Sequence, residues 1–152
     1  MATLPAEDSM TPLILALLAF GCADDDTSGD GHDYHHHGDS TLPDDFDDST
    51  EKTTESGIVV AYTTDPEVLT ESDEFSVIIT HSGGTITKAD ATMPSHGGHG
   101  MNVYPQLEDD GEGTVVANPF QFHMPGHWEL FVQLETEQGE IETVRFDMAC
   151  CD

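Results

Sequence analysis

From Gly57 onward, apolar and polar residues alternate in short runs with a period of two. In segment 74–81, for example, Phe75, Val77 and Ile79 occupy every second position. This spacing puts the three side chains on one face of an extended strand, whereas a helix would need apolar residues every three to four positions. The alternation therefore predicts an all-β domain.

We expect about seven short strands, separated by turns rich in Gly, Pro and acidic residues. The expected strands cover 58–62, 74–81, 86–93, 101–107, 114–123, 127–136 and 141–148. Lys88-Ala89 should disturb the alternation of the third strand, and Pro105 should interrupt the fourth. Residues 57–152 have the size of a single immunoglobulin-like β-sandwich, which is the predicted fold.

Residues 23–56 differ in composition from this domain. They are rich in Asp, Ser, Thr, Gly and His, and Leu42 and Phe46 are among their few apolar residues. Such a segment buries too little apolar surface to offset its ordering entropy, so it is predicted to be a disordered tether. Its His-rich tract either chelates a divalent metal as a secondary site or binds metal only incidentally. The tract consists of His32, His35, His36 and His37.

The apolar run 13–20 is too short to cross a bilayer as a helix, which needs roughly 20 residues. It matches the hydrophobic part of a secretory signal, and Leu18-Ala19-Phe20-Gly21-Cys22 is similar to a bacterial lipobox. Residues 1–22 are therefore interpreted as a lipoprotein signal peptide with Cys22 as the lipidated residue, and the alternative is a short buried helix. A lipid anchor implies a membrane-attached protein of the cell envelope, facing the periplasm or the exterior.

The net charge limits the classes of partner. Against 31 Asp and Glu residues there are only three Lys and Arg, which gives a formal net charge of −28. Such a surface repels phosphate backbones, so nucleic-acid binding is not expected. The charge either favours cations and basic partners or serves only to keep the chain soluble.

The segment 93–101 combines Met93, His96, His99 and Met101 with Pro and Gly. Thioether sulfur is a soft ligand and imidazole a borderline one, so together they suit copper better than calcium or magnesium. His96 and His99 are flanked by polar or Gly residues, which favours exposure, and they are either metal ligands or solvated loop residues.

A second segment, 122–128, repeats this composition with His123, Met124 and His127. Both segments are expected to connect strands, so at one end of a sandwich their side chains could form a single site. The alternative for Met93, Met101 and Met124 is packing over the end of the core, where Met fills irregular gaps.

These segments resemble the YtkA-like domain family. The resemblance rests on one Met-Pro…His-Gly-Met motif and one Met-x-Gly-x-Trp motif, and covers roughly residues 70–148. The matching residues are Met93, Pro94, His99, Gly100, Met101, Met124, Gly126 and Trp128. The family is related in pattern to FixH proteins of cytochrome oxidase assembly and is similar in fold to CopC-type copper carriers. The resemblance implies a small exported or membrane-anchored β-sandwich that handles copper.

The predicted function is therefore copper binding, as Cu(I) or Cu(II), by an envelope lipoprotein that serves as carrier, buffer or donor to an oxidase assembly partner. The alternative is a protein-interaction or structural module of the envelope without a metal site. An enzyme is not predicted, because no nucleophile motif, paired catalytic carboxylate or nucleotide loop is present. The adjacent Cys150 and Cys151 could form a disulfide, bind a soft metal, link two chains or have no function.

Overall fold

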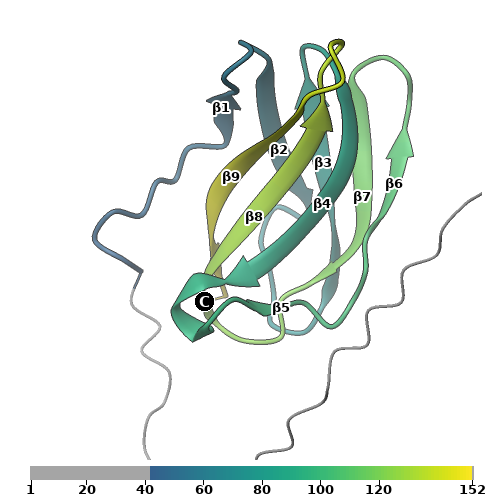
Figure 1. Cartoon of the computed structure of the whole chain (residues 1–152). Helices are drawn as coiled ribbons and strands as arrows, with labels where there is room; N and C mark the ends of the chain where they lie inside the picture. The colour runs from purple at the N-terminus through teal and green to yellow at the C-terminus, as the bar shows by residue number, and fades with distance from the viewer. Residues whose placement is uncertain (1–41, 152) are drawn as a thin grey trace, which may run out of the picture. The chain divides into compact units, whose positions relative to one another are not determined.

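A computed structural model describes residues 42–151 and shows two antiparallel β-sheets packed face to face (Figure 1). The predicted all-β sandwich is confirmed, but it has nine strands and not seven. Within residues 42–151, no helix is long and apolar enough to span a membrane.

The first sheet has the strand order β1-β2-β3-β7-β6. Its strands are β1 (Glu51–Thr53), β2 (Val59–Asp65), β3 (Glu74–His81), β7 (Thr114–Gln121) and β6 (Gln106–Asp109). The second sheet has the order β5-β4-β8-β9. Its strands are β5 (His99–Gly100), β4 (Thr85–Met93), β8 (Gly126–Glu135) and β9 (Ile141–Cys150), and a 3-10 turn, η1 (Pro94–His96), precedes β5.

The two strands that alternation did not predict are the shortest ones. β1 lies inside the region predicted to be a tether, and it pairs with Val59–Ala61 of β2. The ordered domain therefore begins before Gly57, and its first strand has no apolar residue that could mark it in the sequence. β5 consists of two residues of the Met/His segment, paired with the end of β4.

One proline shortens an expected strand, and another coincides with a change of register. The strand expected over 101–107 is confined to β6, which begins directly after Pro105, because Pro offers no backbone N–H to a ladder. Glu108 and Asp109, expected in a turn, belong to β6. Pro119 lies inside β7 at the point where the pairing with β3 changes register, so no regular ladder bond is lost there.

The alternating residues fill the space between the sheets. Trp128, Leu130, Val132 and Leu134 of β8 are fully buried, as the pattern predicted. The predicted disturbance at Lys88 is confirmed as a register shift between β4 and β8. At one end of the sandwich the core is aromatic: the ring of Phe122 stacks on Trp128 at 4.4 Å, and Phe75 contacts Phe122 at 5.0 Å between ring centroids.

Candidate metal site

Two of the predicted ligands meet at the aromatic end of the sandwich. The Nε2 atoms of His99 and His123 lie 3.0 Å apart, within hydrogen-bond distance. His99 comes from β5, and His123 comes from the connection between β7 and β8. The pair therefore joins the two segments that the sequence predicted would form one site.

The backbone around His99 explains its position. After η1 the chain reverses through Gly97 and Gly98, whose φ angles of 67° and 77° are strained for residues with a Cβ atom. The N–H of Gly98 donates to the carbonyl of Met93 at 3.1 Å and closes the turn. His99 then lies directly opposite Met93 in the ladder, so the two side chains share the face of the sheet that looks into the sandwich.

His123 is held mainly by packing. Its ring lies edge-on to the indole of Trp128, with 5.5 Å between centroids. Its Nδ1 atom is buried and has no hydrogen-bond partner within the described part of the chain. Nε2 is therefore the nitrogen that His123 presents to His99.

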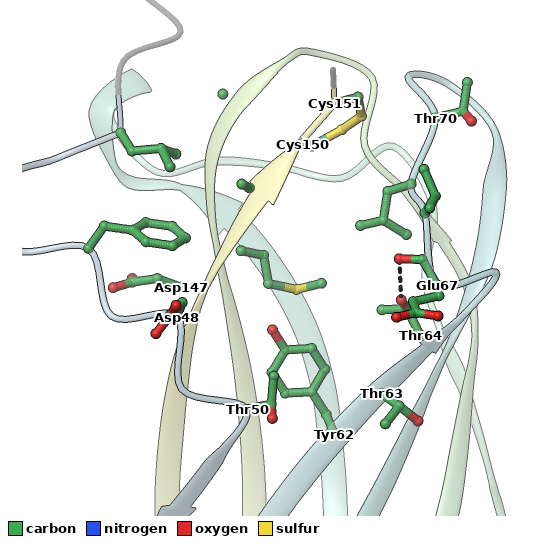
Figure 2. A pocket seen from close by; sticks show the side chains of 17 residues that line it. Asp48, Thr50, Tyr62, Thr63, Thr64, Glu67, Thr70, Asp147, Cys150 and Cys151 are labelled. Carbon is green, nitrogen blue, oxygen red and sulfur yellow. Dashed lines mark hydrogen bonds between the residues drawn. A yellow bond between two sulfur atoms is a disulfide. The ribbon is translucent and has the colours of Figure 1, made fainter.

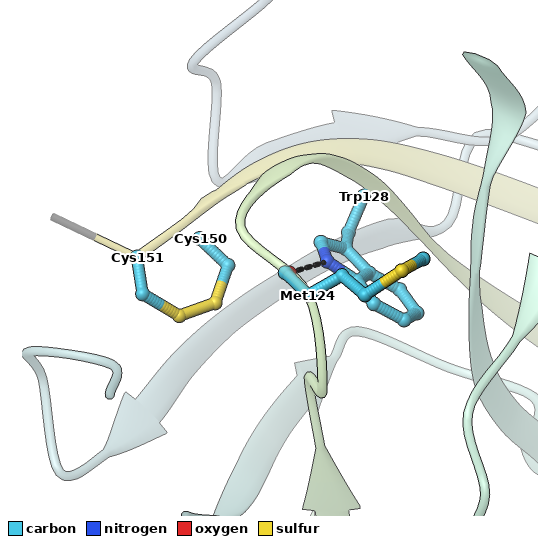
Figure 3. Close-up of a disulfide and its surroundings, with 4 residues drawn as sticks. All are labelled: Met124, Trp128, Cys150 and Cys151. Atoms are coloured by element: carbon cyan, nitrogen blue, oxygen red, sulfur yellow. Dashed lines mark hydrogen bonds between the residues drawn. A yellow bond between two sulfur atoms is a disulfide. The ribbon is translucent and has the colours of Figure 1, made fainter. Parts of the chain in front are cut away.

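The three methionines predicted as ligands all lie in the core or pack against it. Met93 is only 1% exposed, whereas Met101 and Met124 are half-buried and pack against the core. The Trp128 indole N–H donates to the carbonyl of Met124 at 3.0 Å, which is drawn as a dashed line in Figure 3. Core packing thus accounts for Met93, while Met101 and Met124 lie at the boundary between core and surface.

The structure does not bring His96 and His127 to the pair. His96 ends η1 with an exposed side chain. His127 alternates with the buried Trp128, so it faces outward from the second sheet and contacts Asp147 and Phe46. Among residues 42–151, no group of three or more His, Cys, Asp or Glu side chains could hold a metal ion. A metal bound at the His pair would therefore have at most two ligands of these four types among the described residues.

His127 also helps to hold residues 46–47 against the second sheet. The sequence had predicted that these residues belong to a disordered tether. Asp147 accepts hydrogen bonds from His127 Nε2 at 2.9 Å and from the backbone N–H of Asp47 at 3.0 Å. Phe46 packs edge-on to His127, and Lys52 pairs with Asp47 at 3.0 Å. Phe46 was the sequence signal for this contact, since an apolar residue in a polar segment needs a surface to cover.

Two opposing effects act on the pKa of Asp147. Burial alone would raise it, but the hydrogen bonds from Asp47 and His127, with the positive charges of His127 and Lys52, hold it below the ordinary value of 3.8. A carboxyl whose pKa is depressed by folding stabilises the fold fully above its unfolded pKa, and this contribution is lost as the pH falls through the folded value. The anchor should therefore persist down to about pH 3.8 and weaken below it.

Replacing Asp147 with Asn should loosen the segment around Asp47. We expect the Asp47 amide hydrogen to exchange several-fold faster at pH 6, because a hydrogen bond to a charged group contributes roughly 1–3 kcal/mol. Below pH 3.8 the difference in exchange rate between the original chain and the variant should shrink, because the Asp147 carboxyl becomes protonated there. Asp73→Asn is the control, since Asp73 is exposed and its side chain makes no hydrogen bond in the described structure. Equal exchange in both variants would contradict the anchor.

Cys150 and Cys151 are joined in a disulfide beside Met124 and Trp128 (Figure 3). Cys150 is buried at the end of β9 and pairs in register with Gly126. Of the possibilities left open by the sequence, the structure contains the intrachain bond.

The remaining predicted sites lie outside the described residues. These are the lipidation site Cys22 and the tract formed by His32, His35, His36 and His37.

No family model, curated protein or solved structure matches this chain. The resemblance to the YtkA-like family is thus carried by the motif residues alone.

Proposed function

We propose that this chain binds copper between His99 and His123, with the half-buried Met101 and Met124 as candidate thioether ligands. The observation that carries the proposal is the 3.0 Å separation of the two Nε2 atoms, contributed by two separate loops. Two imidazole nitrogens this close together can both donate a lone pair to one bound cation.

The chemistry of the donor set favours copper over other metals. Imidazole binds both Cu(I) and Cu(II), and thioethers select Cu(I). Calcium and magnesium prefer carboxylate and carbonyl oxygen, and no carboxylate hydrogen-bonds to either imidazole of the pair in the described structure. The formal net charge of −28 adds a general attraction for cations.

The fold fits a carrier, buffer or donor better than a catalyst in this proposal. The ring of His123 rests on the buried Trp128, so one ligand is fixed, while the exposed His99 lies on the short strand β5. One fixed and one accessible ligand allow an ion to be taken up and passed on. In this proposal, Cys22 attaches the protein to a membrane of the cell envelope, and the protein delivers copper to an oxidase assembly partner.

Copper titration tests the site. The chain used as background carries Ala in place of His32, His35, His36 and His37, so that this tract binds no metal. We expect about one equivalent of Cu(I) to bind, measured anaerobically by competition with a chromophoric chelator. Changing His99 and His123 to Ala should weaken binding by more than about 100-fold, because loss of even one supporting partner of a ligand costs about 10–100-fold.

His96→Ala is the matched control, because His96 is an exposed His of the same loop that does not contact the pair. It should leave the affinity unchanged. Retention of copper by the His99/His123 double variant, with its fold verified by circular dichroism, would remove the basis for the proposal.

A further inference from the structure

A groove on the side of the sandwich has neither His99 nor His123 among its lining residues. It has a volume of about 910 Å³ and opens between the segment before β1, the β2–β3 connection and the end of β9. Figure 2 shows Cys150 and Cys151 at one end of this side groove and Tyr62 with Thr50 at the other. Nothing in the copper proposal uses it.

The side groove has a mixed lining, in which apolar side chains lie beside Thr, Asp and Glu residues. Tyr62, Leu69 and Met148 line it and pack against or within the core. At its margin, Val68 is 79% exposed and Leu42 is 42% exposed. Exposed apolar side chains beside charged ones at the rim of a groove are typical of a surface that binds a partner.

Strand edges without partners border the same hollow. β9 pairs only with β8, so its other edge has no strand partner within residues 42–151. β1 pairs with β2 only at Val59–Ala61, so in the described part of the chain Thr63–Asp65 has no strand on that side. An extended peptide can add to such an edge through backbone hydrogen bonds while alternate side chains enter the pocket.

The acidic residues at the rim of the side groove favour a basic partner. Asp48 and Glu67 are exposed and lie on opposite sides of it (Figure 2). The chain's three basic residues are already paired with carboxylates: Lys52 with Asp47, Lys88 with Asp90 and Arg145 with Glu129. Residues 1–41 contain no Lys or Arg, and a second copy would also carry a charge of −28. Electrostatic repulsion therefore disfavours occupation of the side groove by residues 1–41 of the same chain or by a second copy of the chain.

We propose that the side groove binds an extended segment of another protein in which apolar and basic residues alternate. The apolar side chains enter between Tyr62, Leu69 and Met148, and the basic side chains meet Asp48 and Glu67. The backbone of the segment pairs with the free edge of β9 or β2.

A synthetic peptide serves as the probe, acetyl-Lys-Val-Lys-Val-Lys-Val-Lys-amide, titrated calorimetrically into the full-length chain. We expect saturable binding, with NMR shift changes concentrated at the residues of the side groove. A peptide with Glu in place of Lys should not bind. A Lys/Val peptide with N-methyl groups on alternate amides should bind at least tenfold more weakly, because it cannot complete a ladder.

Two charge-reversal variants separate this site from general attraction to an acidic protein. Asp48→Lys with Glu67→Lys should weaken binding about tenfold, since two attractive pairs become repulsive. Glu112→Lys with Glu137→Lys changes the net charge equally at two exposed turns outside the side groove and should have little effect. Equal weakening by both variants, equal binding of the N-methylated peptide, or no binding at all would overturn the proposal.

Discussion

Replacing Trp128 with Ala should lower the free energy of unfolding by about 3–5 kcal/mol, the usual cost of removing a large aromatic group from a core. Trp128 is fully buried, stacks on Phe122 at 4.4 Å and donates to the carbonyl of Met124. The substitution therefore leaves a cavity and an unpaired carbonyl at once. Chemical denaturation followed by circular dichroism measures the loss.

Tyr104→Ala is the control for this prediction. Tyr104 is also aromatic but is 85% exposed, so its removal should change stability by less than about 0.5 kcal/mol. Similar losses for the two variants would mean that Trp128 does not occupy the centre of the aromatic cluster.

Replacing Gly84 with Ala should also destabilise the fold strongly. Gly84 has a φ of +72°, which costs a residue with a Cβ atom about 1–3 kcal/mol. A Cβ atom at this position would in addition lie 2.8 Å from the backbone carbonyl oxygen of Glu135. Because that oxygen belongs to β8, the β3–β4 turn and the end of β8 would have to separate.

Gly57→Ala isolates the second effect. Gly57 has a similar φ of +89°, but a Cβ atom there would meet nothing within 4 Å. We expect Gly84→Ala to lose at least about 1 kcal/mol more than Gly57→Ala in the same denaturation experiment, because only Gly84 combines strain with a backbone clash. Equal losses of unfolding free energy would show that the β3–β4 turn moves away from β8 without a measurable cost.

The alternation of apolar residues was sufficient to predict the long strands. Each of these buries one face, so Trp128 in β8 and Phe146 in β9 could be assigned to the interior from the spacing together with the size of the apolar side chains. Alternation could not reveal β1, whose three residues are Glu, Lys and Thr. That strand depends on the free edge of β2, which exists only once the sheet has formed.

The candidate site could be predicted in part, from the composition of two loops and the predicted sandwich. The Met and His content of the two loops indicated soft-metal chemistry, and the sandwich brought both loops to one end. Which histidines meet depends on details that composition does not contain. The two-residue strand β5 places His99 opposite Met93, and the side-chain alternation of β8 turns His127 to the outer face.

The chain contains a single tryptophan, and its indole touches the ring of His123. Its fluorescence therefore reports on this end of the molecule without any label. A paramagnetic Cu(II) ion bound at His123 would quench the emission. A peptide in the side groove carries no such ion and would not quench by this mechanism. One optical signal can thus follow metal uptake while calorimetry follows the partner.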